Sequence, residues 1–583
     1  MIRCATSSLH DALREGQPSH VSHASRALVA LFEQVPFHKL ESGLIKDIIA
    51  DLYPADTKLS TSSNPVILIG ILQVFGVIES ITPPHPEVAE RFDEMFDWFH
   101  GLAFPPRVQM MDNNVRYVAI SNLSLLAVLD TRNFFEKYPQ LQPCLEDAVR
   151  HDKDQSIVIH CLRLLKTVGK SGNTMSNNDP EGEKRLLHFW LSVLKPSLLD
   201  SVEERNCPVL KAALCNCIAE VGGGIFCHLP TDRRVLALTF MLRLCRDKDH
   251  RTVTASTRGL GMLVSLPSLQ NDTAFLTDCA EIMIEIAQYS VTKPCHQSVI
   301  TSCTWALANL SDSLAKHHLS PDADDIFPPY LVLQLIRMSI KSSFATCTNS
   351  HMTIRSNSVR SLGSLLQCLD GMSKFVCIEE YPEVAELCLE AVDAIAKNIA
   401  NGKVMKVRWN ACYAAGGLLK AKEKLICSDQ SRQNIIQAIL PVIESCPNYK
   451  VRINGALALT SVRERSVFGP LYCSTVKSIV KSLEAAVSNL EDSDEIQHRS
   501  DLIDQLCATY AHLLSLIDSN DIPILENELA EDVDLLTDAF KSALLRISPE
   551  KTGVFVEAQR RLNELGKGYP SIFPSSLVES LIL

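Results

Sequence analysis

The chain has 583 residues, of which 46% are hydrophobic and 21% charged, a composition typical of folded rather than disordered proteins. Its formal net charge of −12 argues against nucleic-acid binding through a bulk positive field. A chain of this length exceeds what one compact core usually serves, so we expect either several globular domains or one elongated repeat domain.

The N-terminal stretch MIRCATSSLHDALREG contains no apolar segment of the kind that a signal peptide needs. We therefore expect an intracellular protein, cytoplasmic, nuclear or both. The longest apolar run, Pro65 to Ile78, is too short to cross a bilayer, so we expect no membrane span. The 20 cysteines are scattered singly, mostly inside apolar helical patterns, as reduced buried thiols are in intracellular proteins.

A recurring helical pattern runs along most of the chain. Each copy begins with an aliphatic residue, called the anchor below. In the four best copies, which begin at Val299, Ile354, Val407 and Val451, small residues follow the anchor four and seven positions later. The other copies match more weakly, and the one at Val253 is one residue out of phase. In the clearest copy, KVRWNACYAAGGLL, Val407 is followed by Ala411 and Ala414. The anchors are, in chain order, Val21, Ile67, Val115, Ile157, Val209, Val253, Val299, Ile354, Val407 and Val451. They are about 42 to 55 residues apart, close to the period of HEAT and armadillo repeats.

A second amphipathic segment, with apolar residues three or four positions apart, lies between successive anchors. Three examples are Arg233–Cys245, Tyr330–Ile340 and Asn434–Ser445. Asp or Asn often precedes the anchor helix, where an N-cap is expected. No segment shows a convincing strand pattern. We predict an all-α fold, a right-handed alpha-alpha superhelix (a HEAT/armadillo-like solenoid) of about nine to ten helical repeats.

The repeats are expected to fill residues 1–470, with polar inserted loops near 169–184 and 317–329. After about residue 471 the pattern fades, and 471–583 is expected to form a C-terminal helical cap that continues the solenoid. Small residues at the fourth and seventh positions would let neighbouring helices approach closely. The same requirement would explain Gly416 and Gly417, which each cost a helix about 1 kcal/mol.

Signatures of known chemistry are missing from the sequence. It contains no GxSxG, HExxH, kinase motif set or EF-hand loop, and VGGGIFCHLP lacks the Gly-Lys-Ser/Thr of a phosphate loop. Cys207, Cys215, Cys217, Cys227 and His228 cluster in sequence without the CxxC spacing of a structural zinc site. We expect no enzyme and no catalytic residue, cofactor or metal, and keep a zinc-binding or enzymatic protein as the less favoured reading.

Trp305 and Asn309 are the first candidates for contact with a partner. They lie one turn apart on the expected helix and look like the Trp-x-x-x-Asn unit that importin-type armadillo repeats use to hold an extended peptide. Such binding requires the pair in successive repeats. The equivalent pairs here are Arg360/Ser364, Tyr413/Gly417, Leu457/Ser461 and Ser121/Leu125. A peptide-binding array is therefore disfavoured, and a single local pocket stays open.

An arginine follows the anchor in four repeats, as Arg116, Arg355, Arg408 and Arg452. Arg355 and Arg408 are candidates for a basic stripe that meets an acidic partner. The alternative, which we favour, is a structural ladder that ties adjacent repeats together. Trp409 and Tyr413, one turn apart and opposite the apolar stripe of their helix, complete the set of candidate partner-binding residues.

Several stretches resemble, in order, the HEAT repeat-containing protein 6 family. They are VPFHKLESGLI, LPTDRRVLALTFMLRL with STRGLG, TWALANLSDSL, KVRWNACYA, CPNYKVRINGALAL followed by RERSVFG, and LIDQLCATYAHLLSLIDSNDIP. The resemblance implies a HEAT solenoid and brings no catalytic residues. Family members are larger and have a further N-terminal portion, so a shorter homologue and an incomplete chain both stay open.

Taken together, these patterns predict a non-enzymatic scaffold or adaptor that binds a protein partner along the solenoid surface. The main alternative is a nuclear-transport-type carrier of cargo or peptides. The sequence does not identify the partner or the cellular process.

Overall fold

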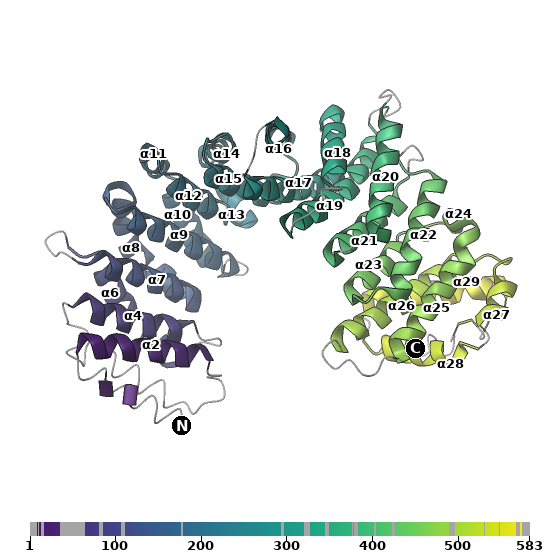
Figure 1. Ribbon diagram of the computed structural model, residues 1–583, viewed down its shortest axis with the longest axis horizontal. Coiled ribbons are helices and arrows are strands. Elements are labelled where there is room, and N and C mark those ends of the chain that lie inside the picture. The colour runs from purple at the N-terminus through teal and green to yellow at the C-terminus, as the bar shows by residue number, and fades with distance from the viewer. Residues whose placement is uncertain are drawn as a thin grey trace. The chain divides into compact units, whose positions relative to one another are not determined.

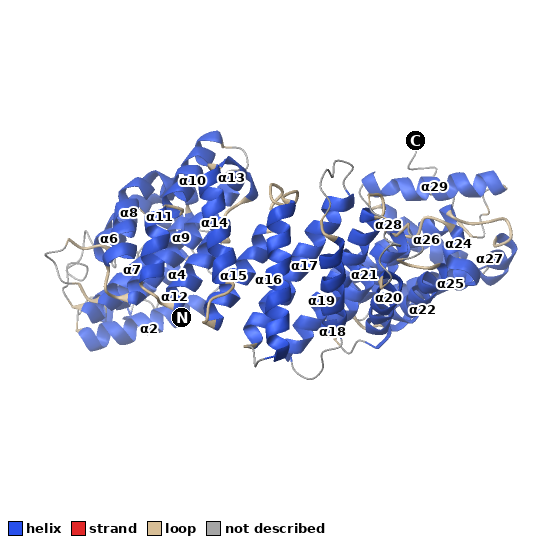
Figure 2. Cartoon of the chain, turned by 90° about the horizontal axis from the view of Figure 1, so that it is seen from above, coloured by secondary structure: helices blue, strands red, loops and turns tan. Residues whose placement is uncertain are grey.

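The computed structural model describes most of the chain. The described residues are 8–9, 11–12, 17–34, 64–80, 86–106, 111–175, 179–292, 296–319, 327–343, 349–375, 377, 383–401, 404–422, 426–488, 496–529, 531–546, 549–566, 569 and 572–573. They form helices and connecting loops, without a strand in any of these ranges (Figure 2). The all-α prediction is therefore confirmed. The VPFHKLESGLI stretch lies outside the described residues.

The chain divides into two compact units, Met1–Ser268 and Leu269–Leu583. The first unit contains α2 (Pro18–Gln34), α4 (Pro65–Glu79), α5 (Pro86–Glu90), α6 (Phe92–Ala103), α7 (Asn113–Leu129), α8 (Thr131–His151), α9 (Gln155–Met175), α10 (Pro180–Val193), α11 (Pro196–Glu204), α12 (Pro208–Ile218), α13 (Gly223–His228), α14 (Thr231–Leu244) and α15 (His250–Leu263).

The second unit contains α16 (Thr273–Thr292), α17 (Gln297–Leu319), α18 (Pro329–Ser343), α19 (Asn349–Met372), α20 (Val384–Asn401), α21 (Met405–Lys420), α22 (Asp429–Ser445), α23 (Tyr449–Leu459), α24 (Arg465–Phe468), the 3-10 turn η3 (Gly469–Leu471), α25 (Tyr472–Ser488), α26 (Ile496–Ser515), α27 (Ile522–Leu529), α28 (Val533–Leu544) and α29 (Pro549–Leu565).

Each unit is built from helix pairs stacked in two layers (Figure 1). In the first unit, α2, α4, α7, α9, α12 and α15 pack side by side, and we call them B helices. Their partners α6, α8, α10, α11 and α14, the A helices, pack against them. In the second unit the B helices are α17, α19, α21, α23 and α26, and the A helices are α16, α18, α20, α22 and α25. This pairing is the helical-repeat solenoid that the sequence predicts.

All ten predicted anchors lie on B helices, as the repeat pattern requires. Nine of them are buried, from Val21 in α2 to Val451 in α23. The exception is Val209 in α12, which is only partly buried, whereas its neighbour Leu210 is fully buried. The predicted register of that repeat was therefore wrong by one position.

The predicted N-caps are confirmed at three B helices. Asp112 accepts a hydrogen bond from the backbone N–H of Asn114 at 2.8 Å, and Asp249 accepts one from Arg251 at 2.9 Å. Asn448 caps α23 by accepting from the N–H of Val451 at 3.2 Å. These side chains satisfy backbone donors that the first turn of a helix leaves unpaired.

Small residues bring neighbouring B helices into close contact. Ala411 and Ala414 of α21 are fully buried. A Cβ atom on Gly363 of α19 would lie 2.6 Å from the Cα atom of Ala414, so only glycine allows this approach. On the other side of α21, a Cβ on Gly416 would lie 3.4 Å from Cα of Ala458 in α23. The glycines inside α19 and α21 thus lower helix propensity but permit tight packing between repeats.

The predicted inserted loop near 169–184 was wrong for most of its length. Helix α9 continues to Met175, and α10 begins at Pro180. The physical reason is packing: a Cβ on Gly169 would lie 2.5 Å from the ring of Trp190, and one on Gly172 would lie 3.0 Å from the ring of Phe135. These glycines are contact points for bulky side chains rather than loop residues.

The predicted loop near 317–329 was wrong at both ends. His317 and His318 are buried residues in the last turn of α17, and α18 begins at Pro329. Residues 320–326 lie outside the described residues. The predicted boundary near 470 does not coincide with the division of the chain after Ser268, and α25 packs on both α22 and α26.

The first stability prediction concerns the contact between Gly363 and Ala414. Ala414→Leu should destabilise the protein by about 1–3 kcal/mol, because the added atoms overpack the α19–α21 junction. Chemical unfolding followed by circular dichroism measures the change. Ala385→Leu, at an exposed position of α20, is the matched control and should leave the midpoint of unfolding nearly unchanged. Equal midpoints for the two variants would contradict the assigned contact.

A second prediction concerns the buried histidine pair. The rings of His317 and His318 lie edge to face with centroids 4.8 Å apart, and neither ring nitrogen of His318 has a hydrogen-bond partner. Burial and, secondarily, His317 lower the pKa of His318 to about 4. An unfolded histidine has a pKa of about 6.5. Below pH 6.5 the His318 ring is therefore protonated in the unfolded chain, whereas in the folded protein it stays neutral down to about pH 4.

The stabilisation from His318 is thus fully present above pH 6.5 and is lost as the pH falls toward 4. His318→Leu should make the melting temperature less dependent on pH across this window. Melting curves at a series of pH values test this. His23→Leu on α2, where the side chain is exposed, serves as the control. A slope unchanged by His318→Leu would show that this residue does not set the acid response.

Candidate partner-binding surface

The arginines that follow the anchors are tied into the fold. Arg355 on α19 donates from Nε to the carbonyl of Ser343 at the end of α18 at 3.1 Å. It also donates from Nη2 to Oδ1 of Asn398 on α20 at 2.9 Å. One side chain thus connects three helices from two consecutive repeats.

The same connection recurs in the next two repeats. Arg408 donates from Nε to the carbonyl of Ile399 at 3.0 Å, and its Nη1 lies 3.7 Å from Sγ of Cys446. Arg452 donates to the carbonyl of Ile443 at 2.8 Å and to the hydroxyl of Ser482 at 2.8 Å. Burial lowers the pKa of Arg452. These guanidinium groups therefore point into repeat junctions.

The first unit has the same ladder. Arg116 donates to the carbonyl of Ala103 at 3.1 Å and to the carboxylate of Asp152 at 2.6 Å. On α12, Lys211 pairs with Asp247 at 2.9 Å. Lys211 follows Leu210, the residue that takes the anchor position in α12. The partners are 36 residues apart along the chain both in the Arg116–Asp152 pair and in the Lys211–Asp247 pair. The geometry favours the structural alternative, because Arg355 and Arg408 both hydrogen-bond groups at repeat junctions.

Trp305 and Asn309 both lie half-buried on α17. In the next repeat their positions are taken by Arg360 and Ser364 of α19. Both of these side chains bond the carboxylate of Asp312 on α17. The position that would extend a Trp/Asn pocket is therefore filled by a polar link between helices, and these two repeats do not form a peptide-binding array.

Trp409 and Tyr413 lie together on the exposed side of α21, with 37% and 51% of their surface accessible. Leu457 of α23 is 47% exposed. Nζ of Lys450, on the same helix as Leu457, lies 5.9 Å from the Trp409 ring centroid, within the range of a cation–π contact. Burial raises the pKa of the Tyr413 hydroxyl, with Asp312 acting in the same direction and Arg360 against it.

Tyr413 and Leu457 both line a cavity of about 210 Å³ between α21 and α23, and Lys420 lies on its wall. Gly416 and Gly417 line it as well, so the absence of side chains there keeps the space open. Together with Trp409 and Lys450, which contact each other beside it, three lining residues form what we call the α21–α23 patch: Trp409, Tyr413, Lys420, Lys450 and Leu457. It contains two of the six residues that the sequence singled out.

The patch also contains exposed positive charge. Lys420 and Lys450 are exposed, and neither has a carboxylate within ion-pair distance among the described residues. Lys406, one turn before Trp409, is also exposed. These lysines and Leu457 are not among the six residues predicted from the sequence to bind a partner. A signal existed, because Lys406 and Lys450 each come directly before an anchor, and Tyr413 and Leu457 each lie six residues after one.

The cysteine and histidine cluster near residue 215 does not converge. Cys207 donates to Oε1 of Gln155 at 3.3 Å, and Nδ1 of His228 lies 2.7 Å from a carboxylate oxygen of Glu183. Cys215 is buried, and burial raises its pKa well above the usual range, which favours the neutral thiol. In the part of the chain that the structure describes, no three His, Cys, Asp or Glu side chains form a group that could hold a metal.

Comparisons with known proteins assign neither a family nor a function to this chain. No model of a known protein family matches the chain. An uncharacterized protein from Dictyostelium discoideum is 22% identical over 495 residues, which are 67% of this chain and 32% of that protein. The chain therefore spans about a third of the length of the curated relative it matches.

Solved structures with a similar course include the karyopherin Kap121p, which is 12% identical and aligns over 99% of this chain and 68% of its own, with a TM-score of 0.44. Kap121p bound to the extreme C-terminus of the phosphatase Cdc14p gives 11% identity, 97% and 64% coverage and a TM-score of 0.46. An engineered protein is 14% identical and aligns over 78% of this chain and 98% of its own, with a TM-score of 0.42. Similarity at this level does not assign a function.

Fold and surface together define the class: this is an all-α helical-repeat protein. Among the described residues, no helix has both the length and the apolar character needed to cross a bilayer. The class is defined by stacked helix pairs, and its chemistry must be sought on the surfaces that the stack exposes.

The ladder leads to a prediction. Arg355→Met keeps an unbranched stem but removes the donors to Ser343 and Asn398, so it should destabilise the protein by about 1.5–3 kcal/mol. Lys406→Met makes the same kind of change at an exposed position and should stay within about 0.5 kcal/mol of the parent protein. Chemical unfolding measures both. A stable Arg355→Met variant would return Arg355 to the list of surface candidates.

Proposed function

We propose that this protein is a non-enzymatic scaffold that binds another protein through the α21–α23 patch. The observation that carries the proposal is the grouping of three side chains that are each more than a third exposed: Tyr413 and Leu457 line one cavity, and Trp409 lies one turn before Tyr413 on α21. Trp and Tyr are the side chains most often found at the centres of protein interfaces. An exposed apolar group beside a cavity commonly marks a site of interaction.

The charge around the patch indicates the kind of partner. Lys406, Lys420 and Lys450 surround the aromatic residues, although the chain as a whole is acidic. A partner segment with acidic side chains beside an apolar anchor would match both features. Rim charges of this kind speed association and set specificity more than they add affinity.

Two finer assignments are also proposals. Four stretches of the C-terminal half resemble the HEAT repeat-containing protein 6 family in the same order, and they support membership of that family. They lie mainly on α21, α23, α24 and α26. An intracellular location, cytoplasmic or nuclear, fits the scattered free thiols, many of which are buried. Transport of cargo is the alternative function, and the single Trp305/Asn309 pair is its support.

Partner capture tests the proposal. The intact chain, the double variant Trp409→Ala/Tyr413→Ala and the control Leu389→Ala are each used for affinity purification with mass spectrometry. Leu389 is 62% exposed on α20 and lies outside the patch. Proteins retained by the parent and the control should be lost with the double variant. Circular dichroism melting establishes that the double variant is folded.

Full retention of every partner by the folded double variant would refute a role for the patch. The carrier alternative is tested by fluorescence anisotropy with a labelled lysine-rich localisation peptide. Binding of that peptide that disappears in Trp305→Ala, but persists in Trp409→Ala/Tyr413→Ala, would favour transport over the proposed scaffold.

A further inference from the structure

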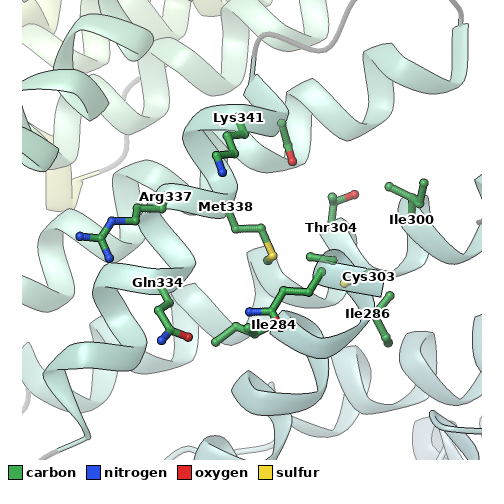
Figure 3. Close-up of a pocket in the computed structure, with 12 residues that line it drawn as sticks. Ile284, Ile286, Ile300, Cys303, Thr304, Gln334, Arg337, Met338 and Lys341 are labelled. Atoms are coloured by element: carbon green, nitrogen blue, oxygen red, sulfur yellow. The ribbon is translucent and has the colours of Figure 1, made fainter. Parts of the chain in front are cut away.

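A second cavity, of about 280 Å³, lies among α16, α17 and α18 in the second unit (Figure 3). Its apolar lining comes from all three helices, as Ile284, Ile286, Ala287, Ile300 and Met338. Figure 3 shows Gln334, Arg337, Met338 and Lys341 along α18, opposite Ile284 and Ile286 of α16. The cavity shares no residue with the α21–α23 patch, so it is a separate candidate site.

Two cations border this cavity on α18. Arg337 and Lys341 lie one turn apart, and both belong to its lining. Arg337 forms an ion pair with Glu383 at 3.4 Å. Lys341 is exposed, and within the described ranges it has no carboxylate at ion-pair distance. Lys341 is therefore the charge available to a ligand that enters the cavity.

The other flank of α18 is acidic. A cavity of about 310 Å³ between α18 and α20 is lined by Glu383, Glu386 and Glu390 together with Arg337 and Lys341. Glu386 and Glu390 have no ion-pair partner in the part of the chain described here. Across α18 the surface thus changes in a fixed order, from an apolar cavity to a cationic ridge to an acidic strip.

We propose that the apolar cavity, the cationic ridge and the acidic strip together bind an extended peptide segment of another protein that crosses α18. An aliphatic side chain enters the cavity, an acidic side chain pairs with Lys341, and a basic side chain meets Glu386 and Glu390. A peptide with its acidic and basic side chains exchanged would place a positive charge against Lys341 and a negative charge against Glu386 and Glu390.

The extent of the surface favours a peptide over a small molecule. No glutamate lines the apolar cavity, so a small ligand held within it contacts Lys341 but neither Glu386 nor Glu390, which line the second cavity. A helix is about 10 Å across, and an extended chain advances about 3.3 Å per residue, so roughly three to five residues cross it. Aliphatic, acidic and basic side chains at alternate positions of a short peptide cover all three strips.

The probe is the synthetic peptide acetyl-Ser-Leu-Ser-Asp-Ser-Lys-Ser-amide, together with the peptide of reversed sequence, because the direction of crossing is open. Binding to the full chain is followed by the NMR signal of methyl-labelled methionine. The Met338 signal is assigned by its loss in Met338→Leu. It should shift and saturate with one of the two peptides at millimolar concentration.

Charge exchange makes the test specific. Lys341→Glu should weaken the peptide that binds by about five-fold, the upper end for one exposed ion pair, and should strengthen a peptide in which Asp and Lys are exchanged. Glu390→Lys should also favour the exchanged peptide. Trp409→Ala/Tyr413→Ala should bind as the parent does, which separates this site from the α21–α23 patch.

Two results would overturn the inference. A Met338 signal that neither peptide direction moves would show that the cavity takes no such anchor. Equal affinity of Lys341→Glu for the original and exchanged peptides would show that the charge order has no role.

Discussion

The structure depends on one constraint: a single helix pair cannot bury its own apolar faces. Each pair is covered on both sides by its neighbours, so stability arises at the junctions between repeats. Close approach at these junctions requires small side chains, which is why Gly363 faces Ala414 and Gly416 faces Ala458. The polar ladder completes the same junctions, because Arg355, Arg408 and Arg452 satisfy carbonyls at the ends of A helices where the helix dipole is negative.

Most of the fold could be predicted because stacking of similar helix pairs requires apolar and capping residues at regular intervals along the sequence. The aliphatic anchors and the N-caps recur at fixed positions and were found without a structure. The failures came where composition and packing disagree. The segment from Gly169 to Met175 has the composition of a loop, yet it is helical because Trp190, Phe189 and Phe135 occupy the space its glycines leave. At α12, Val209 and Leu210 are equally apolar, and spacing alone could not choose between them.

The surface was less predictable, because sequence gives the type of a charge and not its surroundings. Arginine and lysine side chains have different roles in this protein. The planar guanidinium of Arg355 fits two acceptors on two helices, whereas the ammonium groups of Lys406, Lys420 and Lys450 stay in solvent beside the aromatic pair. Trp409 and Tyr413 were identified because large aromatic side chains stand out on the polar face of a helix. Their neighbours Leu457 and Lys450 come from the next repeat, which sequence spacing does not bring together by itself.

The ladder is also interrupted. The residue after the anchor is uncharged in α2, α4 and α9, as Ser22, Leu68 and Val158, and also in α15 and α17, as Thr254 and Ile300. The repeats of α15 and α17 therefore have no cation at the position that Arg116, Lys211 and Arg355 occupy. They flank the division of the chain after Ser268. In a linear array the stability of each segment reflects its nearest neighbours. Amide hydrogens of α15 and α17 would then exchange with solvent earlier than those of α19 to α23, where the ladder is continuous.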